Sequence, residues 1–150
     1  MTSRENGRPL TVVFTDVEGS TELLSREGDD IAGEILRTHE EIVRSHILEC
    51  GGTEEAFLGD GFMATFETPQ DAVTCATRIQ RSLHSHNEKA DRPVRVRIGL
   101  HVGDVTRRAG QIYGQTVHAA ARVMGEAAGG QIYVSEAVKA ALAATPSLID

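Results

Sequence analysis

The fold of this chain is decided by residues 10–21, Leu10-Thr11-Val12-Val13-Phe14-Thr15-Asp16-Val17-Glu18-Gly19-Ser20-Thr21. The apolar run from Leu10 to Phe14 predicts a buried strand. The Gly-Ser-Thr sequence that ends the stretch is a good opening for a helix. Asp16 is therefore expected at the point where a strand meets a glycine-bearing turn.

A second aspartate occupies a similar position in Leu58-Gly59-Asp60-Gly61-Phe62. The segments 53–58 and 62–66 on either side predict a β-hairpin with Asp60 in its tight turn. If the strands form a βαββαβ sheet with the first strand antiparallel to the third, the end of strand one lies beside the start of strand three. That topology would bring Asp16 and Asp60 together, and two carboxylates at strand ends form a candidate divalent-metal site.

Strands and helices alternate along the rest of the chain. Apolar residues at helical spacing predict helices over about 29–50, 69–86 and 115–128, and a last helix capped by Ser135 that runs to about Leu142. Residues 94–100 alternate as a half-buried strand, and residues 131–134 predict a short one. Three glycines within 103–114 indicate a loop. We expect one domain over 10–144, between a flexible segment 1–9 and a tail 145–150.

Composition excludes several classes of function. A chain of 150 residues suits one domain with a real core. The net charge of −7 offers no broad basic surface, which argues against nonspecific binding to nucleic acid or to anionic membranes. No apolar stretch approaches the roughly 18 residues of a membrane span, and the polar start lacks the hydrophobic region of a signal peptide. The expectation is a cytoplasmic protein.

Four motifs follow one another in a specific order. They are Phe14–Thr21, Gly59–Phe66, Arg97–Val105 and Tyr113–Val123. In this order and spacing they resemble the catalytic domain of class III nucleotidyl cyclases, and the similarity spans about Leu10 to Leu142. The resemblance implies an α+β fold, a ferredoxin-like βαββαβ sandwich of the cyclase type. Family domains usually continue into a C-terminal strand pair, which we do not expect in this chain.

The resemblance also implies a metal site. In the family, two Mg²⁺ or Mn²⁺ ions are held by two aspartates, matched here by Asp16 and Asp60, and by a backbone carbonyl, matched by Val17. The ribose 3′-hydroxyl attacks its own α-phosphorus, so that one ion lowers the pKa of the hydroxyl while the other neutralises the triphosphate and the leaving pyrophosphate. ATP is the favoured substrate and GTP the alternative.

Phosphate contacts are expected beside this metal site. Four residues at a helix N-terminus would place backbone N–H groups against phosphate: Glu18, Gly19, Ser20 and Thr21. An ordinary helix cap is the alternative for the last three of these residues. Arg97, on the strand before Gly99, is a candidate phosphate contact, and an exposed strand arginine is the alternative.

The catalytic and base-facing positions depart in part from the family pattern. Arg122 matches the arginine that stabilises charge on the transferring phosphate. His118, four residues earlier on the same helix face, stands where the family usually has an asparagine that orients the ribose. Ala56 stands where adenylyl cyclases commonly have a lysine, and Gln111 where they have an aspartate. These departures leave the choice between ATP and GTP open.

In this family the active site lies between two subunits. The resemblance therefore implies a homodimer in which one chain supplies Asp16 and Asp60 and the other supplies Ala56, Gln111, His118 and Arg122. Two hypotheses follow. The chain is either a cyclase that converts ATP to 3′,5′-cyclic AMP and pyrophosphate, or a catalytically degenerate cyclase-homology module that dimerises, binds nucleotide or regulates other domains.

Overall fold

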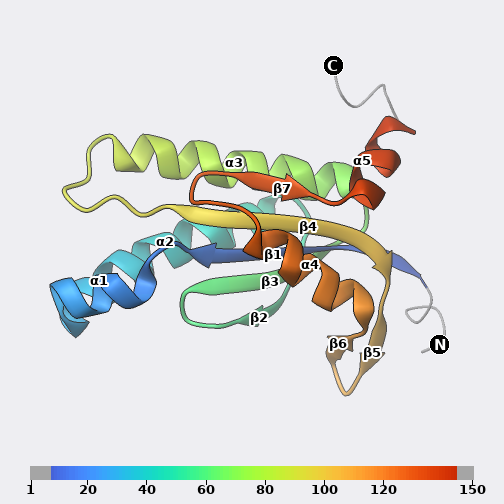
Figure 1. Cartoon of the computed structure of the whole chain (residues 1–150), viewed down its shortest axis with the longest axis horizontal. Coiled ribbons are helices and arrows are strands. Elements are labelled where there is room, and N and C mark those ends of the chain that lie inside the picture. Colours follow the sequence, from blue (N-terminus) through green and yellow to red (C-terminus); the bar gives the residue numbers. More distant parts are fainter. Residues whose placement is uncertain (1–7, 145–150) are drawn as a thin grey trace.

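The structure is a computed structural model that describes residues 8–144. Its main sheet has five strands in the order β2-β3-β1-β4-β7, and a separate two-stranded sheet pairs β5 with β6. In chain order the elements are β1 (Pro9–Val17), α1 (Ser20–Glu27), α2 (Asp29–Glu49), β2 (Thr53–Phe57), β3 (Gly61–Phe66), α3 (Pro69–Asn87), β4 (Val96–Asp104), β5 (Thr106–Arg108), β6 (Gln111–Tyr113), α4 (Gln115–Gly125), β7 (Ile132–Val134) and α5 (Glu136–Ala143) (Figure 1).

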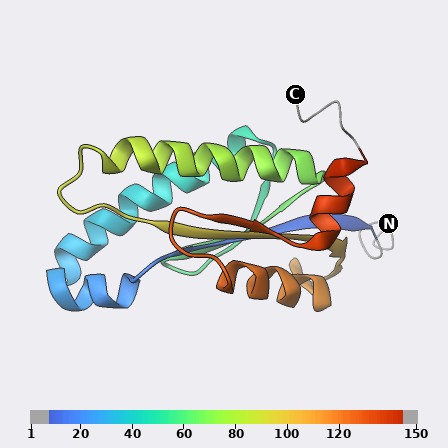
Figure 2. The same ribbon diagram turned by 45° about the horizontal axis from the view of Figure 1, so that its top comes forward.

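The expected α+β, ferredoxin-like βαββαβ topology is confirmed. β1 lies in the centre of the sheet and runs antiparallel to both β3 and β4, while β7 adds a parallel strand beside β4. Helices α2 and α3 cover one face of the sheet and α4 covers the other (Figure 2). The crossover helices α2 and α3 thus cover one face of β1, α4 covers the other, and β3 and β4 pair with its two edges.

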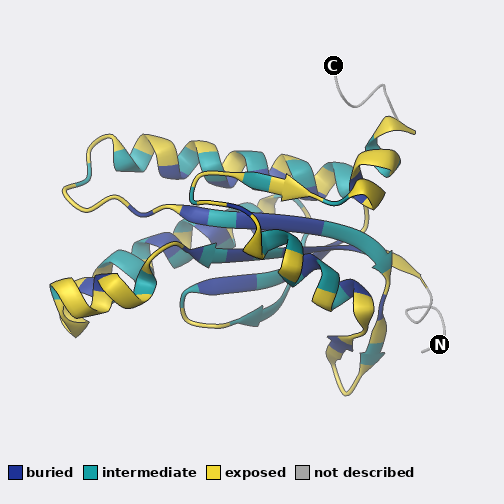
Figure 3. Cartoon of the chain, in the orientation of Figure 1, coloured by how far each residue is buried: buried dark blue, intermediate teal, exposed yellow. Residues whose placement is uncertain are grey.

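The core divides into two clusters because successive side chains of a strand point to opposite faces. On the face of α2 and α3, Val13 packs with Ile47 and Ile79. On the face of α4, Val12 packs with Ala120. Buried residues accordingly line the central strands, whereas the helices expose their outer surfaces (Figure 3). No helix within residues 8–144 is long and apolar enough to span a bilayer.

The predicted loop 103–114 is wrong. β4 continues through Asp104, and β5 and β6 form a hairpin in which Arg108 pairs with Gln111 across the two-residue turn 109–110. Both turn residues have positive φ, 53° at Ala109 and 81° at Gly110. Such turns match the right-handed twist of the paired strands. Alanine is unusual at this conformation, so the turn was not visible in the sequence.

Smaller differences concern element ends. β1 begins at Pro9, so the expected flexible segment 1–9 is wrong at its last residue. The remainder of that segment, residues 1–7, and the tail 145–150 lie outside the described residues. The predicted helix 115–128 ends three residues early at Gly125. Ser20 does open a helix, α1, which Gly28 separates from α2.

Gly61 marks the closest approach between the hairpin and β1. A β-carbon at this position would lie 2.1 Å from the Thr15 carbonyl oxygen, which is backbone and has little room to move. We expect Gly61→Ala to destabilise the fold by about 1–3 kcal/mol, because extra volume in a packed contact forces the backbone apart. Urea unfolding followed by circular dichroism measures the change.

The matched control is Gly33→Ala on α2, where a β-carbon meets no atom of the described residues within 4 Å. Alanine in a helix interior is expected to stabilise this position by about 0.5–1 kcal/mol. Equal effects of the two substitutions would contradict the close approach at Gly61.

His39 is a buried polar side chain at the centre of α2. It is 1% exposed, packs on Phe62, and neither ring nitrogen bonds to another side chain within the described residues. Burial lowers the pKa of His39 below 6.5, because the charged ring is costly in an apolar surrounding. The unfolded chain therefore binds a proton more readily than the native state does as the pH falls below about 6.5.

We expect the protein to lose stability as the pH falls from 7.5 to 5.5, and His39→Leu to remove part of this loss. At pH 7.5 the variant should be more stable by about 1 kcal/mol, since a polar ring leaves the apolar core. Thermal melts across this pH range provide the measurement. His84→Leu, at an exposed position of α3, serves as the control and should keep the wild-type pH dependence.

Candidate active site

Asp16 and Asp60 lie side by side at one end of the sheet. The β1–β3 register places Asp16 opposite Gly61, and the Val17 N–H donates to the Asp60 carbonyl oxygen at 2.9 Å. The Ser20 hydroxyl donates to Asp60 Oδ2 at 2.7 Å, which orients that carboxylate. Antiparallel pairing of β1 with β3 therefore brings together the two aspartates as the sequence predicts.

The carboxylates of Asp16 and Asp60 are both negative and partly buried, so their repulsion needs a compensating positive charge. Burial raises the pKa of the Asp16 carboxyl, and the charge of Asp60 raises it further, whereas a hydrogen bond from Arg97 lowers it. Arg97 lies opposite Asp16 in the β1–β4 register and forms an ion pair with Asp16 Oδ2. Its Nε is buried without a hydrogen-bond partner among the described residues. The guanidinium thus supplies positive charge at the carboxylate pair.

A cavity of about 490 Å³ opens beside these three side chains. Its wall includes the segment 17–22, and Ala127 and Ala128 close it on the side of α4. Helix α1 begins in this wall after Gly19, whose φ of 74° is left-handed, and no side chain of the described residues caps it. The first turn of a helix leaves N–H groups without intrahelical acceptors and carries the positive end of the helix dipole. This wall therefore favours an anion.

Glu18 has a different part in this wall from its neighbours. Its N–H donates to the Arg95 carbonyl at 2.8 Å, and its Oε2 accepts from the Gly129 N–H at 2.9 Å. A β-carbon at Gly129 would lie 2.6 Å from both Glu18 Oε1 and Arg95 Cβ, so the contact is close at this position. Glu18 therefore links the turn after α4 to the end of β1 through hydrogen bonds. The N–H groups of Gly19, Ser20 and Thr21 remain to bind an anion.

The other predicted site residues lie elsewhere in the chain. Ala56 is on β2, Gln111 is exposed on β6, and His118 and Arg122 are exposed on α4. None of these four is among the described residues that line the cavity. The structure of one chain therefore separates the predicted residues into two sets, one at the cavity and one outside it.

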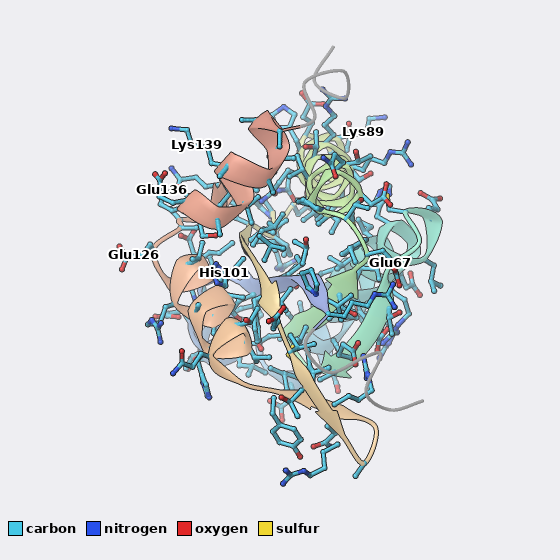
Figure 4. The ribbon with its side chains drawn as sticks, turned by 90° about the vertical axis from the view of Figure 1, so that its right-hand side faces the viewer. Glu67, Lys89, His101, Glu126, Glu136 and Lys139 are labelled. Atoms are coloured by element: carbon cyan, nitrogen blue, oxygen red, sulfur yellow. The ribbon has the colours of Figure 1, made fainter. Side chains whose placement is uncertain are left out.

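The second set has local partners that the sequence did not suggest. The Tyr113 hydroxyl donates to Gln111 Oε1 at 3.0 Å, which orients the carboxamide. The charge of Arg122 reaches His101 on β4, whose pKa is lowered first by burial and then by this charge. His101 also contacts the hydroxyl of Ser135, the N-cap residue of α5, at 2.7 Å. Lys139 points outward from α5 (Figure 4).

Three contacts at the site were missed by sequence reasoning. They are the Arg97–Asp16 ion pair, the Ser20–Asp60 hydrogen bond and the Tyr113–Gln111 hydrogen bond. The spacing of Tyr113 and Gln111 is that of side chains on one strand face, and it was a usable signal once residues 111–113 were recognised as a strand. The other two contacts depend on strand register, which a single sequence does not display.

The donor set at the cavity suits a hard divalent cation. Asp16 and Asp60 offer carboxylate oxygens, and Val17 contributes backbone to the same wall. Within residues 8–144 no group of three or more His, Cys, Asp or Glu side chains is placed to hold a metal ion. Two carboxylates are nevertheless enough for Mg²⁺, which commonly takes its remaining ligands from water and from substrate phosphates. The residues present therefore fit a metal that binds together with a phosphorylated ligand.

Comparisons with known proteins agree with this geometry. A sequence profile described as the adenylate and guanylate cyclase catalytic domain matches residues 3–149. An uncharacterized protein of Mycobacterium tuberculosis is 35% identical over 130 residues, which cover 85% of this chain and 43% of that protein. The serine/threonine-protein kinase pkn2 of Myxococcus xanthus is 30% identical over 135 residues, which cover 88% of this chain and 16% of that protein.

Solved structures give the same result. The adenylate/guanylate cyclase/hydrolase from Silicibacter pomeroyi superposes with a TM-score of 0.77 at 30% identity, over 93% of this chain and 80% of that one. The chain spans less than half the length of the two curated relatives named above. The profile match over nearly all residues, the paired aspartates and the ferredoxin-like sheet lead to one conclusion: the chain belongs to the family of adenylate and guanylate cyclase catalytic domains.

Proposed function

We propose that this domain is a nucleotidyl cyclase that converts ATP to 3′,5′-cyclic AMP and pyrophosphate at a homodimer interface. The observation that carries the proposal is the cavity in which Asp16 and Asp60 lie beside the uncapped N-terminus of α1. A carboxylate pair for divalent cations and an adjacent anion site are the two features that a metal–triphosphate complex requires.

The reaction makes separate demands on the two ends of the nucleotide. Two Mg²⁺ or Mn²⁺ ions, held by Asp16, Asp60 and the Val17 carbonyl, would lower the pKa of the ribose 3′-hydroxyl and neutralise the triphosphate. The N–H groups of Gly19 to Thr21 bind phosphate oxygens at the helix N-terminus. Arg97 keeps its guanidinium at the same wall, where it balances negative charge.

The transition state needs further charge stabilisation. Arg122 supplies a fixed guanidinium for the equatorial oxygens of the α-phosphate as the 3′-oxygen attacks and pyrophosphate leaves. His118, four residues earlier on the same exposed face of α4, donates a hydrogen bond to the ribose. Gln111 and Ala56 face the base, the former through its amide and the latter through shape alone. ATP is the favoured substrate and GTP the alternative.

The division of these residues between two places supports a dimer. Arg122 and His118 are outside the cavity of their own chain. In a dimer they would act on a nucleotide held in the cavity of the second copy. A two-fold axis then produces two equivalent sites, each with metal-binding residues from one chain and transition-state residues from the other. A single chain has no complete site and is expected to be inactive.

A second candidate function is a regulatory module without turnover. His118, Ala56 and Gln111 depart from the residues that the family usually has, and the Arg97 guanidinium already pairs with Asp16. In the Myxococcus xanthus relative the matching region is a small part of a protein named as a kinase. A domain that dimerises and binds nucleotide without cyclising it would serve such an arrangement. Turnover of ATP and of GTP by the dimer, measured with Mn²⁺, separates the two functions.

The first test concerns the metal. Asp16→Asn and Asp60→Asn are each expected to weaken Mn²⁺ binding at least roughly 10- to 100-fold. A loss of roughly this size already follows when a residue that only hydrogen-bonds to a metal ligand is mutated. Mn²⁺ titration followed by electron paramagnetic resonance measures the free ion. At pH 7 the Asp60→Asn apo protein should be no less stable than wild type, because it removes a negative charge that raises the pKa of the Asp16 carboxyl and leaves the Arg97–Asp16 ion pair in place.

Asp91→Asn, at an exposed position in the loop before β4, is the charge-matched control. Its Mn²⁺ affinity should equal that of wild type. If the two site variants also bind Mn²⁺ like wild type, the paired aspartates are not ligands and the proposed mechanism is wrong.

The second test concerns the shared site. Asp16→Ala and Arg122→Ala should each be inactive alone, since each dimer then carries the same defect twice. After subunit exchange half of the dimers contain one of each chain, and one of their two sites is intact. The mixture should therefore regain about a quarter of wild-type activity.

Exchange is verified by mass spectrometry of isotope-labelled chains. A mixture that exchanges fully and stays inactive, while wild type turns over ATP, would show that the site is not divided between chains. A wild-type dimer that binds metal and nucleotide without forming product would support the regulatory module instead.

A further inference from the structure

A partly buried ion pair connects β2 to the β5–β6 hairpin. The Glu55 side chain is 3% exposed, and its two oxygens accept from the two terminal nitrogens of Arg107 at 3.0 and 2.9 Å. The Thr65 hydroxyl donates to Glu55 Oε2 at 2.7 Å. Paired bonds between a guanidinium and a carboxylate fix orientation as well as distance. This contact therefore holds the hairpin in one defined position against the sheet.

An irregularity in β2 sets the direction of the Glu55 side chain. The pairing of β2 with β3 shifts between Glu54 and Ala56, so Glu55 is the extra residue of a β-bulge. Bulges redirect a side chain and bend the strand locally. Glu54 forms its own paired contact with Arg44 of α2, at 2.7 and 2.9 Å. Two consecutive glutamates thus tie β2 to two different elements.

The pair adjoins both residues that we assign to the nucleotide base. Ala56 follows Glu55 directly in β2. Arg107 lies opposite Ile112 in the β5–β6 register, and Ile112 is the neighbour of Gln111. Two-stranded hairpins are marginally stable by themselves, so the position of Gln111 depends on what anchors β5 and β6. Buried Ile112 provides an apolar anchor, and Arg107 provides a directional one.

We propose that Glu55 and Arg107 are positioning residues that set the base selectivity of this site by fixing Gln111 relative to Ala56. The inference rests on the proposed function, because it takes these two residues as the base-facing ones. Alanine offers no hydrogen bond, so discrimination between adenine and guanine depends on one amide, which the Tyr113 hydroxyl orients. The selectivity of a single amide is sensitive to its placement, since a shift of about 1 Å is enough to change binding and rate roughly 100-fold.

The test compares Glu55→Gln with Glu54→Gln. Both remove one carboxylate from a paired arginine contact in the same strand, but only the first contact reaches the hairpin. Affinities for 3′-deoxy-ATP and 3′-deoxy-GTP, which lack the attacking hydroxyl, are measured with Mn²⁺ on the dimer. We expect Glu55→Gln to change the ratio of the two dissociation constants at least about tenfold, and Glu54→Gln to leave the ratio at the wild-type value.

Two further measurements separate positioning from a general loss of structure. Amide hydrogen exchange of residues 106–113 should become faster in Glu55→Gln and stay unchanged in Glu54→Gln. Mn²⁺ binding at Asp16 and Asp60 should be unchanged in both variants. An unchanged nucleotide ratio in a folded Glu55→Gln protein whose hairpin exchanges faster would overturn the proposal.

Removing one partner of a partly buried ion pair risks unfolding, because the remaining charge loses its carboxylate partner. The double variant Glu55→Gln with Arg107→Gln leaves no such charge and is expected to change the ratio in the same way. Arg107→Lys keeps the charge without the paired geometry and should give an intermediate ratio. A double variant with the wild-type ratio would also overturn the proposal.

Failure of the proposed function has a different signature. If wild type binds both analogues but forms no product from ATP or GTP, the enzyme proposal fails while the ratio of dissociation constants still decides the role of the ion pair. If wild type binds neither analogue, there is no base subsite and the positioning proposal is wrong.

Discussion

The antiparallel pairing of β1 with both β3 and β4 is the constraint on which the rest of the structure depends. It places Asp16 opposite Gly61 on one side and opposite Arg97 on the other. One strand register thereby sets the carboxylate pair, the arginine that compensates its charge and the entry into α1. A slip of one residue would turn Asp16 to the opposite face of the sheet and separate it from Asp60.

Charge compensation explains how the fold tolerates this site. Two carboxylates in a half-buried place repel each other and lose hydration, and the raised pKa of Asp16 reflects both effects. Arg97 and the Ser20 hydroxyl offset part of this cost without filling the cavity. A site that carries excess negative charge when empty is well suited to bind divalent cations, because binding relieves the repulsion that folding has to overcome.

The division of the predicted residues also has a structural origin. The cavity lies at one end of the main sheet, whereas His118 and Arg122 lie along the exposed face of α4 and Gln111 lies on the small hairpin. Gly99 lets the backbone of α4 pack directly on β4, since a β-carbon there would lie 2.2 Å from the Met124 nitrogen. This contact fixes the rotation of α4 and so determines which of its residues face outward, toward the side on which we propose a second chain.

Much of this arrangement could be predicted from local patterns, because hydrophobic periodicity and glycine-bearing turns carry the signals for element type and order. Residues 10–21 and 58–62 by themselves determined the central strand, the hairpin and the two aspartates at their ends. The β5–β6 hairpin could not be predicted, since its turn places Ala109 at a positive φ that an alanine side chain disfavours. Tertiary structure alone decided the Arg97–Asp16 and Glu55–Arg107 ion pairs, because each joins segments more than 50 residues apart through a strand register or a bulge.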